Sequence, residues 1–505
     1  MSGNVFDNMR NTKRQYKFAI HRLQKCQKII KNDNMISSLM KNNYTNIFDE
    51  IKKIRGRSYS SRSSRIDDAV GAKNIADKFA KIYSDLYSKD KEAEKCGDIH
   101  KKVQEKISEE KYDLNEVNEI VVGKVLKLLK PHKRDSMFDV SSDLYINGPQ
   151  QLTTVLTTAL RAMLIHGYIP QSILLCTLTP IVKNHLDDMT SSSNYRAIAG
   201  GCLILKVIDL VILEIEGGKL HSDALQFAYQ KSSGTIMSTW MVTSIIEHFN
   251  LRGSPVFCAS MDMKKAFDVI SWRQLSDTLL SRNIKGIFLR IILYIYENQV
   301  CQTKWGKEIS HSFQVYNGVR QGGVSSAIFF ALYVDDLLRI LRKSRTGCEI
   351  NGIFYGAIIY ANDIFLLSAS RNGLQNLVNL SNSFARSRNL IFGTDPDPNK
   401  SKSKCLIFYK KDMKNVKNIE LNGRILPWVK NVKYLGFILE ENNSMNQDIL
   451  LKRGIMISTV NNLLQEFHYS SPDVLIKLVM SYAISIYGSS VWPLFSRNCE
   501  KIFKS

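Results

Sequence analysis

At 505 residues the chain is long enough for about two to four domains, and its hydrophobic (44%) and charged (23%) fractions are an ordinary globular mixture. The 69 Lys and Arg against 47 Asp and Glu leave a net charge of +22, which favours a polyanionic partner. No apolar run approaches the ~20 residues that cross a bilayer, and the first residues do not resemble a signal peptide, so we expect nucleic acid as partner rather than a membrane.

The nine cysteines are widely spaced and form no C-x-x-C pair or Cys/His knuckle in the sequence. This pattern predicts no zinc site and reduced cysteines that serve as small core residues. Together with the missing secretion signal, it leads us to expect an intracellular protein of the cytoplasm, the nucleus or both.

The first part of the chain is basic and has a helical pattern. Residues 1–60 carry 13 Lys and Arg against 4 Asp and Glu, with apolar residues at helical spacing. The Ser/Arg stretch 58–65 predicts a loop, and Asn74–Tyr87 predicts a second helix. The strongly charged stretch 89–111 predicts a solvated helix or linker, so contacts to a nucleic-acid backbone are expected only for the region as a whole.

From about residue 115 onward, short runs of β character alternate with helical stretches, which predicts an α/β or α+β domain. Residues 441–505 again have a mostly helical pattern. The predicted strands are Ile173–Val182, Pro255–Met261, Phe313–Tyr316, Phe354–Tyr360, Cys405–Tyr409 and Val432–Leu439.

Two carboxylates stand where predicted strands end. Asp262 follows the apolar run that opens at Pro255, and such a run is typical of a buried strand. Asp363 lies 101 residues later in Tyr360-Ala361-Asn362-Asp363, a polar turn between two apolar runs that predicts a β-hairpin. Such a pair of carboxylates can hold two divalent metals for nucleotidyl transfer, because Mg²⁺ prefers oxygen ligands. A helix N-cap is the alternative role for Asp262, and both roles can hold at one strand-to-helix junction.

A glycine-rich segment, Asn317–Ser326, lies between the two carboxylates in the sequence. Its glycines let the backbone approach a ligand closely, and its Arg320 and Gln321 can contact phosphate or base. A plain loop before a buried helix is the alternative interpretation.

A second candidate for the carboxylate pair is Tyr333-Val334-Asp335-Asp336, which preserves a Tyr-x-Asp-Asp pattern. Apolar residues recur around it at helical spacing, however, so the pattern predicts a helix. We expect Asp335 and Asp336 to be surface or capping groups and place the functional hairpin at 360–363.

The blocks around Asp262, Gly318 and the hairpin, in this order, resemble the palm of reverse transcriptases, specifically those of non-LTR (LINE-type, jockey/CR1-like) retrotransposons. The resemblance covers residues 115–440 as fingers and palm. It extends more weakly to 1–114, similar to the connector before the polymerase, and to 441–505 as the start of a truncated thumb. It implies that the family's upstream endonuclease is missing here. The matching motifs are Thr177–Lys183, Asn194–Ala199, His221–Phe227, Asp262–Asp268, Gly318–Ser326, Tyr360–Asp363, Asn399–Cys405 and Lys433–Gly436.

The resemblance implies an α+β fold of the right-hand polymerase type. Fingers and palm would contain an antiparallel palm sheet with helices, preceded by a helical N-terminal extension and followed by a partial helical thumb. The implied activity is that of an RNA-directed DNA polymerase, in which a primer 3′-oxygen attacks the α-phosphate of a deoxynucleotide with the help of two Mg²⁺ or Mn²⁺ ions. An RNA template, a DNA primer or target and deoxynucleoside triphosphates would be its partners.

The same resemblance assigns four residues to catalysis. Asp262 and Asp363 match metal-binding carboxylates, and Asn362 occupies the place of the carboxylate that bridges both metals. Lys402 matches a lysine proposed to donate a proton to pyrophosphate, although the lysines in this run could equally be solvated.

Five further residues are implied at the nucleotide. Phe267 matches the aromatic residue that screens against a ribose 2′-OH, with a plain core residue as the alternative. Gln321 and Gly322 match positions that line the incoming nucleotide. Arg196 and Lys183 match cationic fingers residues near the triphosphate, where positive charge stabilises the transition state.

Asn362 is where this sequence departs from the family pattern. An amide keeps the shape of Asp but removes a charge that helps two neighbouring cations coexist, while Asn suits a turn because it tolerates positive φ. We therefore expect fold and nucleic-acid binding to survive and catalysis to suffer. Two hypotheses follow, a reverse transcriptase of reduced activity and an inactive retroelement relic that binds RNA or DNA without extending it. An RNA-templated RNA polymerase is a third, disfavoured because Phe267 would crowd a ribonucleotide.

Overall fold

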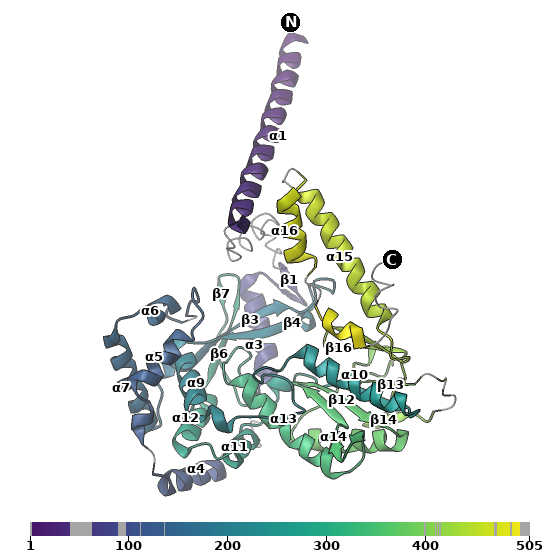
Figure 1. The fold of residues 1–505 in the computed structure, drawn as a ribbon. Helices are drawn as coiled ribbons and strands as arrows, with labels where there is room; N and C mark the ends of the chain where they lie inside the picture. Colours follow the sequence, from purple (N-terminus) through teal and green to yellow (C-terminus); the bar gives the residue numbers. More distant parts are fainter. Residues whose placement is uncertain are drawn as a thin grey trace. The chain divides into compact units, whose positions relative to one another are not determined.

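The computed structural model describes residues 3–40, 63–88, 97–111, 113–135, 137–397, 400–409, 411, 413, 416–468, 472–484 and 487–494. The chain divides into two compact units, one of Met1–Arg62 with Met445–Ser505 and one of Ser63–Ser444. The first unit contains the helices α1 (Gly3–Met40), α15 (Asn446–Glu466) and α16 (Pro472–Tyr482) and the 3₁₀ segment Ser489–Leu494 (Figure 1). Helix α1 agrees with the predicted basic helix, whereas most of the predicted Ser/Arg loop lies outside the described residues.

The second unit is built around a four-stranded antiparallel sheet. Its strand order is β11 (Ala357–Tyr360), β12 (Asp363–Ser368), β5 (Val256–Asp262) and β13 (Lys404–Phe408). Strand β5 is paired on both edges, and five of its seven residues are buried, as its continuous apolar run predicts. The register places the last residue of β5 at the same edge of the sheet as the β11–β12 turn.

Helices pack against this sheet and against one another (Figure 1). Contacts to the strands come from α10 (Thr235–Leu251) and α14 (Arg371–Ser387), while α13 (Ser326–Lys343) packs on α14. Helix α13 carries the Tyr-x-Asp-Asp pattern, which confirms that this pattern is helical. The next layer contains α11 (Trp272–Ser281) and α12 (Gly286–Glu297).

The second sheet is mixed. Two of its strands come before β5 in the sequence, and three lie between β5 and β11. It has the order β4 (Tyr195–Gly200), β3 (Leu175–Val182), β6 (Val300–Trp305) and β7 (Glu308–Ile309), with β8 (Phe313–Gln314) paired to β6. Helix α3 (Ala72–Leu86) packs on β6 and β7. The ring centroid of its Phe79 lies 5.3 Å from that of Tyr195 in β4 and 5.5 Å from that of Trp305 in β6. Part of the sequence before residue 115 therefore belongs to this layer.

Several predicted elements differ in detail from the observed ones. The predicted strand Ile173–Val182 begins with a helical turn, α8 (Gln171–Leu174), and Phe354–Tyr360 is divided between β10 (Ile353–Phe354) and β11. The run Val432–Leu439 is a hairpin of β16 (Asn431–Tyr434) and β17 (Phe437–Glu440), because Leu435 and Gly436 both adopt positive φ between them.

The charged stretch 89–111 is not simply solvated where the structure describes it. Helix α4 (Gly97–Glu109) buries one face with Ile99, Val103 and Ile107, and this face packs against α12. The helical spacing of these three apolar residues could have predicted a buried face, but the many charged residues around them concealed it. The remaining elements are β1 (Arg65–Ile66), β2 (Ala69–Val70), α5 (Glu119–Lys127), α6 (Ser142–Ile146), α7 (Gln150–His166), α9 (Leu203–Glu216), β9 (Glu349–Ile350), β14 (Ile419–Leu421), β15 (Arg424–Leu426) and the 3₁₀ turns Leu114–Glu116, Ser192–Asn194, Gly217–Lys219 and Ala266–Asp268.

Candidate active site

The two predicted carboxylates lie directly opposite each other on neighbouring strands. Asp262 at the end of β5 is the register partner of Asp363 at the start of β12. The hairpin is also observed, since Tyr360 pairs with Asp363 and leaves Ala361 and Asn362 as a two-residue loop. The N–H of Met263 donates to the carbonyl oxygen of Asn362 at 3.2 Å, which ties the loop to the end of β5. Residues separated by a hundred positions in sequence thus form one cluster.

Both oxygens of the Asp262 carboxylate face donor groups. The amide nitrogen Nδ2 of Asn362 donates to Oδ1 at 3.3 Å, and the Lys402 ammonium lies 3.4 Å from Oδ2. That Oδ2 atom is buried and accepts no hydrogen bond from a described residue. Gly393 packs closely here, since a Cβ on it would stand 3.3 Å from Lys402 Cβ and 3.4 Å from Asp262 Oδ2.

Asp363 is a half-buried carboxyl beside a second negative charge. Its pKa is raised to about 6, mainly by burial and also by the Asp262 carboxylate, while the charge of Lys402 opposes the shift. A divalent cation bound between two partly buried carboxylates would offset the repulsion between their negative charges.

The backbone of the turn differs from the prediction. Positive φ, which we expected Asn362 to accommodate, occurs at Ala361 instead, with φ of 54°. An alanine in this region is strained relative to glycine or asparagine, so the surrounding contacts must hold it there. The choice of Asn at position 362 is therefore not explained by turn geometry.

Lys183 lies near three other cations, Arg196, Lys265 and Lys402, of which Lys402 also pairs with Asp262. Lys183 follows β3, Arg196 lies on β4, and Lys265 precedes the 3₁₀ turn Ala266–Asp268. Burial lowers the pKa of Lys183, and the positive charges of Arg196, Lys265 and Lys402 lower it further. The Lys183 ammonium also donates to the Ser193 carbonyl oxygen at 2.7 Å.

The structure also describes the contacts of Phe267, Gln321 and Gly322, the other three residues predicted at the nucleotide. Phe267 is half-buried and stacks on Phe330, with ring centroids 4.5 Å apart. Gly322 has φ of 130°, and a Cβ there would meet the Ala199 carbonyl oxygen at 2.6 Å, so glycine is required for this close approach. Gln321 donates through Nε2 to the Asp268 carboxylate at 2.5 Å.

Sequence reasoning missed two residues that fasten Gln321. The Asp268 carboxylate also accepts from the Tyr87 hydroxyl at 3.0 Å, and burial raises the pKa of this Asp above its usual value. Asp268 belongs to the motif that begins at Asp262, but nothing in the sequence pattern indicated that it would contact Tyr87 or Gln321. Tyr87 ends a helix 181 residues earlier, a separation over which no local signal is expected.

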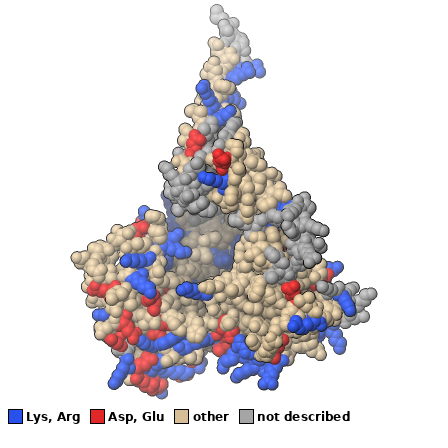
Figure 2. All heavy atoms as spheres, viewed as in Figure 1, with Lys and Arg blue, Asp and Glu red and all other residues tan. Residues whose placement is uncertain are grey.

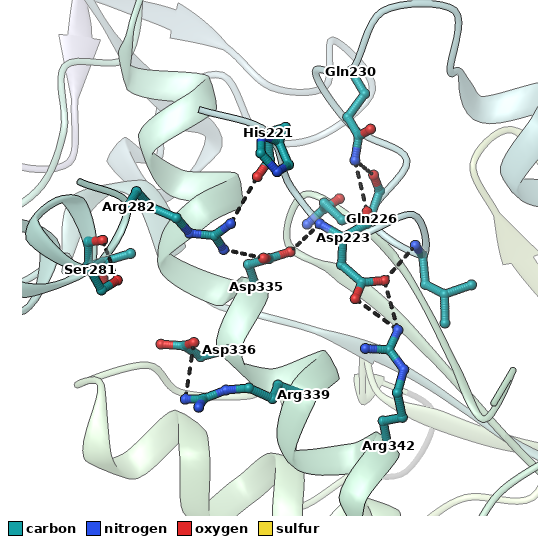
Figure 3. A network of polar contacts seen from close by, with 12 residues as sticks. His221, Asp223, Gln226, Gln230, Ser281, Arg282, Asp335, Asp336, Arg339 and Arg342 are labelled. Atoms are coloured by element: carbon teal, nitrogen blue, oxygen red, sulfur yellow. Dashed lines mark hydrogen bonds and ion pairs between the residues drawn. The ribbon is translucent and has the colours of Figure 1, made fainter. Parts of the chain in front are cut away.

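Two expectations for charged residues are wrong. Arg320 does not face a phosphate: it is buried, and its Nη2 donates to both oxygens of Asp209 at 2.9 and 3.0 Å. Asp335 is not a surface or capping group either, because it is buried against Arg282 and accepts from the backbone N–H of Asp223 at 2.7 Å (Figure 3). Asp336 pairs with Arg388 at 2.8 Å. Each of these acids neutralises an arginine within the fold.

Two observations bear on the predicted cofactor and partners. Among the residues that the structure describes, no group of three or more His, Cys, Asp or Glu side chains is placed to hold a metal ion, so Asp262 and Asp363 stand as a pair. None of the described helices is both long and apolar enough to cross a membrane. Figure 2 shows lysine and arginine side chains spread over the face in view, with acidic ones interspersed mainly toward its lower edge.

Comparison with known proteins agrees with this geometry. The model of the family "Reverse transcriptase (RNA-dependent DNA polymerase)" matches residues 182–439, more than half of the chain. The Pol polyprotein of the type-1 retrotransposable element R2 of Nasonia vitripennis is 23% identical over 262 residues, which are 50% of this chain and 25% of that protein. The polyprotein of the type-2 element R2DM of Drosophila melanogaster is 25% identical over 214 residues, 42% of this chain and 20% of that protein. The chain thus spans about a quarter or less of these relatives' length.

Among solved structures, apo telomerase from Candida tropicalis, truncated from its C-terminal domain, is similar with a TM-score of 0.38 and 11% identity over 61% of both chains. The family match encloses Asp262, Asn362 and Asp363 as well as the glycine-rich segment between them. The mixed helix and sheet architecture and the resemblance to retrotransposon reverse transcriptases of the non-LTR class are confirmed. The chain belongs to the reverse transcriptase (RNA-dependent DNA polymerase) family.

Proposed function

We propose that this chain holds an RNA template, a DNA primer and a deoxynucleoside triphosphate beside Asp262 and Asp363, and that its polymerase activity is strongly reduced by Asn362. The observation that carries the proposal is the register of β5 and β12. It sets the two carboxylates opposite each other at one sheet edge, with the Asn362 amide directed at Asp262.

A divalent cation is implied by the family, and the donor set fits it in part. Asp262 and Asp363 would hold the ion, since the repulsion between them and the unsatisfied Oδ2 of Asp262 favour a cation. When bound, such an ion activates the attacking 3′-oxygen and stabilises the leaving pyrophosphate. Asn362 supplies a neutral group where a second ion needs a negative one, so the site fits one ion better than two.

The protein's own side chains have separate tasks in this proposal. Lys183, Arg196 and Lys265 bind the triphosphate, whose negative charge favours the charged form of Lys183 against the burial and the neighbouring cations that lower its pKa. Phe267, held by its stack on Phe330, excludes a 2′-hydroxyl and so selects deoxynucleotides. Lys402 is close enough to the carboxylates to deliver a proton to the departing pyrophosphate.

Template and primer binding would rest mainly on backbone phosphates. A chain with net charge +22 releases counterions from nucleic acid, so affinity should fall steeply with salt. A-form duplexes are read through their phosphates and 2′-hydroxyls more than through base edges. We also propose that the protein acts inside the cell, in cytoplasm or nucleus, where such substrates occur.

An inactive nucleic-acid-binding relic is the second candidate. The specific observation in its favour is that Asp262 already meets the Asn362 amide at one oxygen and the Lys402 ammonium at the other. A carboxylate that is neutralised from within has less to gain from an incoming cation. In this case binding of primer and template persists, and extension is absent.

Primer extension with Mg²⁺ or Mn²⁺ separates the two candidates. We expect Asn362→Asp to raise the extension rate about 100-fold, because a bridging negative charge is worth several kcal/mol at a metal-assisted transition state. The matched control is Asn351→Asp, an exposed turn residue between β9 and β10 that adds the same charge elsewhere and should change nothing. Equal rates for the parent and Asn362→Asp would place residue 362 outside the metal shell. Primer–template binding without extension in both proteins would favour the relic.

A further inference from the structure

A loop that precedes α10 lies alongside the first strand of the hairpin. The N–H of Phe227 donates to the Ile359 carbonyl oxygen at 2.8 Å, and the N–H of Ile359 donates to the Leu225 carbonyl oxygen at 2.9 Å. Gln226 is therefore the parallel bridge partner of Ile359 in β11. This loop continues the sheet beyond its edge strand and brings Gln226 within two residues of the turn.

The side chain of Gln226 reaches the turn itself. It is fully buried, with 0% exposure, and its Oε1 accepts from the N–H of Ala361 at 3.1 Å and from the N–H of Ala228 at 3.2 Å. Ala361 is the residue with positive φ, a conformation that L-residues other than glycine adopt only when other contacts hold it. We propose that Gln226 is a positioning residue, which fixes the Ala361–Asn362 turn and thereby the place of Asn362 and Asp363 beside Asp262.

The loop can serve as an anchor because a polar network holds it in turn (Figure 3). The Asp223 carboxylate receives two hydrogen bonds from Nη2 of Arg342, at 2.8 and 3.0 Å, and its backbone N–H donates to Asp335. Arg282 pairs with the same Asp335. Helix α13, which carries the Tyr-x-Asp-Asp pattern, therefore supports the hairpin from a distance.

Gln230 completes the anchor. Its Nε2 donates to the carbonyl oxygens of Asp223 at 2.9 Å and of Gln226 at 2.6 Å, so it closes the loop around the residue that reaches the turn. The Arg282–Asp335 ion pair therefore holds the backbone of Asp223, and Gln230 ties Asp223 to Gln226.

A direct test is hydrogen exchange of backbone amides, which does not require enzymatic activity. Gln226→Met keeps the length of the side chain and removes the acceptor. We expect exchange of the segment 357–363 to accelerate about tenfold, because the Ala361 amide loses its only described acceptor, while exchange of 256–261 in β5 stays within about twofold. Gln299→Met, the same change at another buried glutamine, is the matched control and should leave 357–363 unaltered.

Gln226→Glu retains an oxygen at the acceptor position and should restore slow exchange at 357–363. Unchanged exchange at 357–363 in Gln226→Met would overturn the proposal, as would an equal acceleration throughout the sheet, which indicates general loss of stability.

The catalytic consequence rests on the proposed function and is measured separately, in the Asn362→Asp background. Gln226→Met should lower kcat about tenfold and leave the dissociation constant for primer–template unchanged, whereas Gln299→Met should change neither. If Asn362→Asp itself does not extend primers, the proposed function fails, and the exchange result still decides whether Gln226 holds the turn. If extension is present and Gln226→Met leaves kcat unaltered, the positioning role is wrong.

Discussion

The buried ion pair between Arg320 and Asp209 offers a sharp test of how the glycine-rich segment is held. The side chains are only 5% and 4% exposed, and the carboxylate also accepts from the N–H of Val324 at 3.3 Å. Arg320→Met removes one partner and leaves a charge buried without compensation. We therefore expect the free energy of unfolding to fall by about 3–5 kcal/mol.

Matched variants show whether burial causes this cost. Arg134 and Asp139 form an ion pair of similar length, 2.8 Å, but their side chains are 71% and 74% exposed, so Arg134→Met should have little effect. The double variant Asp209→Leu with Arg320→Met removes both buried charges and should lose far less than Arg320→Met alone. Urea unfolding of the parent, Arg134→Met, Arg320→Met, Asp209→Leu and the double variant, with midpoints and slopes compared, measures these differences.

Two results would refute the reasoning about this pair. If Arg320→Met unfolded at the same urea concentration as Arg134→Met, the pair would be hydrated in solution and could not fix the segment. If the double variant were as unstable as the two single losses combined, each side chain would act through other contacts, and the coupling between them would be absent.

Two further predictions concern the same segment and Asp268, which accepts a hydrogen bond from its Gln321. Gly322→Ala should destabilise the protein more than Gly253→Ala. Both positions have positive φ, but only at Gly322 would a Cβ meet backbone, 2.6 Å from the Ala199 carbonyl oxygen. Equal melting temperatures of the two variants would contradict this. Asp268 has a folded-state pKa raised by burial, so its contribution to stability is complete below the unfolded pKa and declines as the pH rises through the folded one. Asp268→Asn should make the unfolding free energy less dependent on pH above the ordinary Asp value of 3.8, which urea midpoints measured at rising pH would reveal.

The sequence predicted those parts of the site in which local pattern and function coincide. The apolar run before Asp262 and the two runs around Asn362 each have a single reasonable interpretation, and both the strand and the hairpin are observed. The helical spacing around Asp335 likewise excluded a second hairpin. What the pattern could not supply was the set of partners, because a hydrogen bond such as Tyr87 to Asp268 depends on the tertiary arrangement.

Charge was the least reliable guide in the sequence. Arg320 stands next to Gln321 in a glycine-rich segment, where a phosphate contact is a natural expectation, yet a buried aspartate from α9 neutralises it. The acidic and basic residues of the stretch 97–109 hid three apolar residues that pack on α12. In both cases burial decided the role, and burial is a property of the fold rather than of the local sequence.

The contacts that hold the hairpin explain why Asn can occupy position 362 without disturbing the fold. The described hydrogen bonds that fix the turn use backbone atoms of Ala361 and Asn362 and the side chain of Gln226, and none of them requires a charge at residue 362. The Asn362 side chain contributes only its contact with Asp262. The fold therefore uses the backbone carbonyl of Asn362, whereas the proposed effect on catalysis rests on its side chain. It follows that Asn362→Asp changes the charge of the site while the supports of the turn stay in place, so any gain in extension can be attributed to that charge.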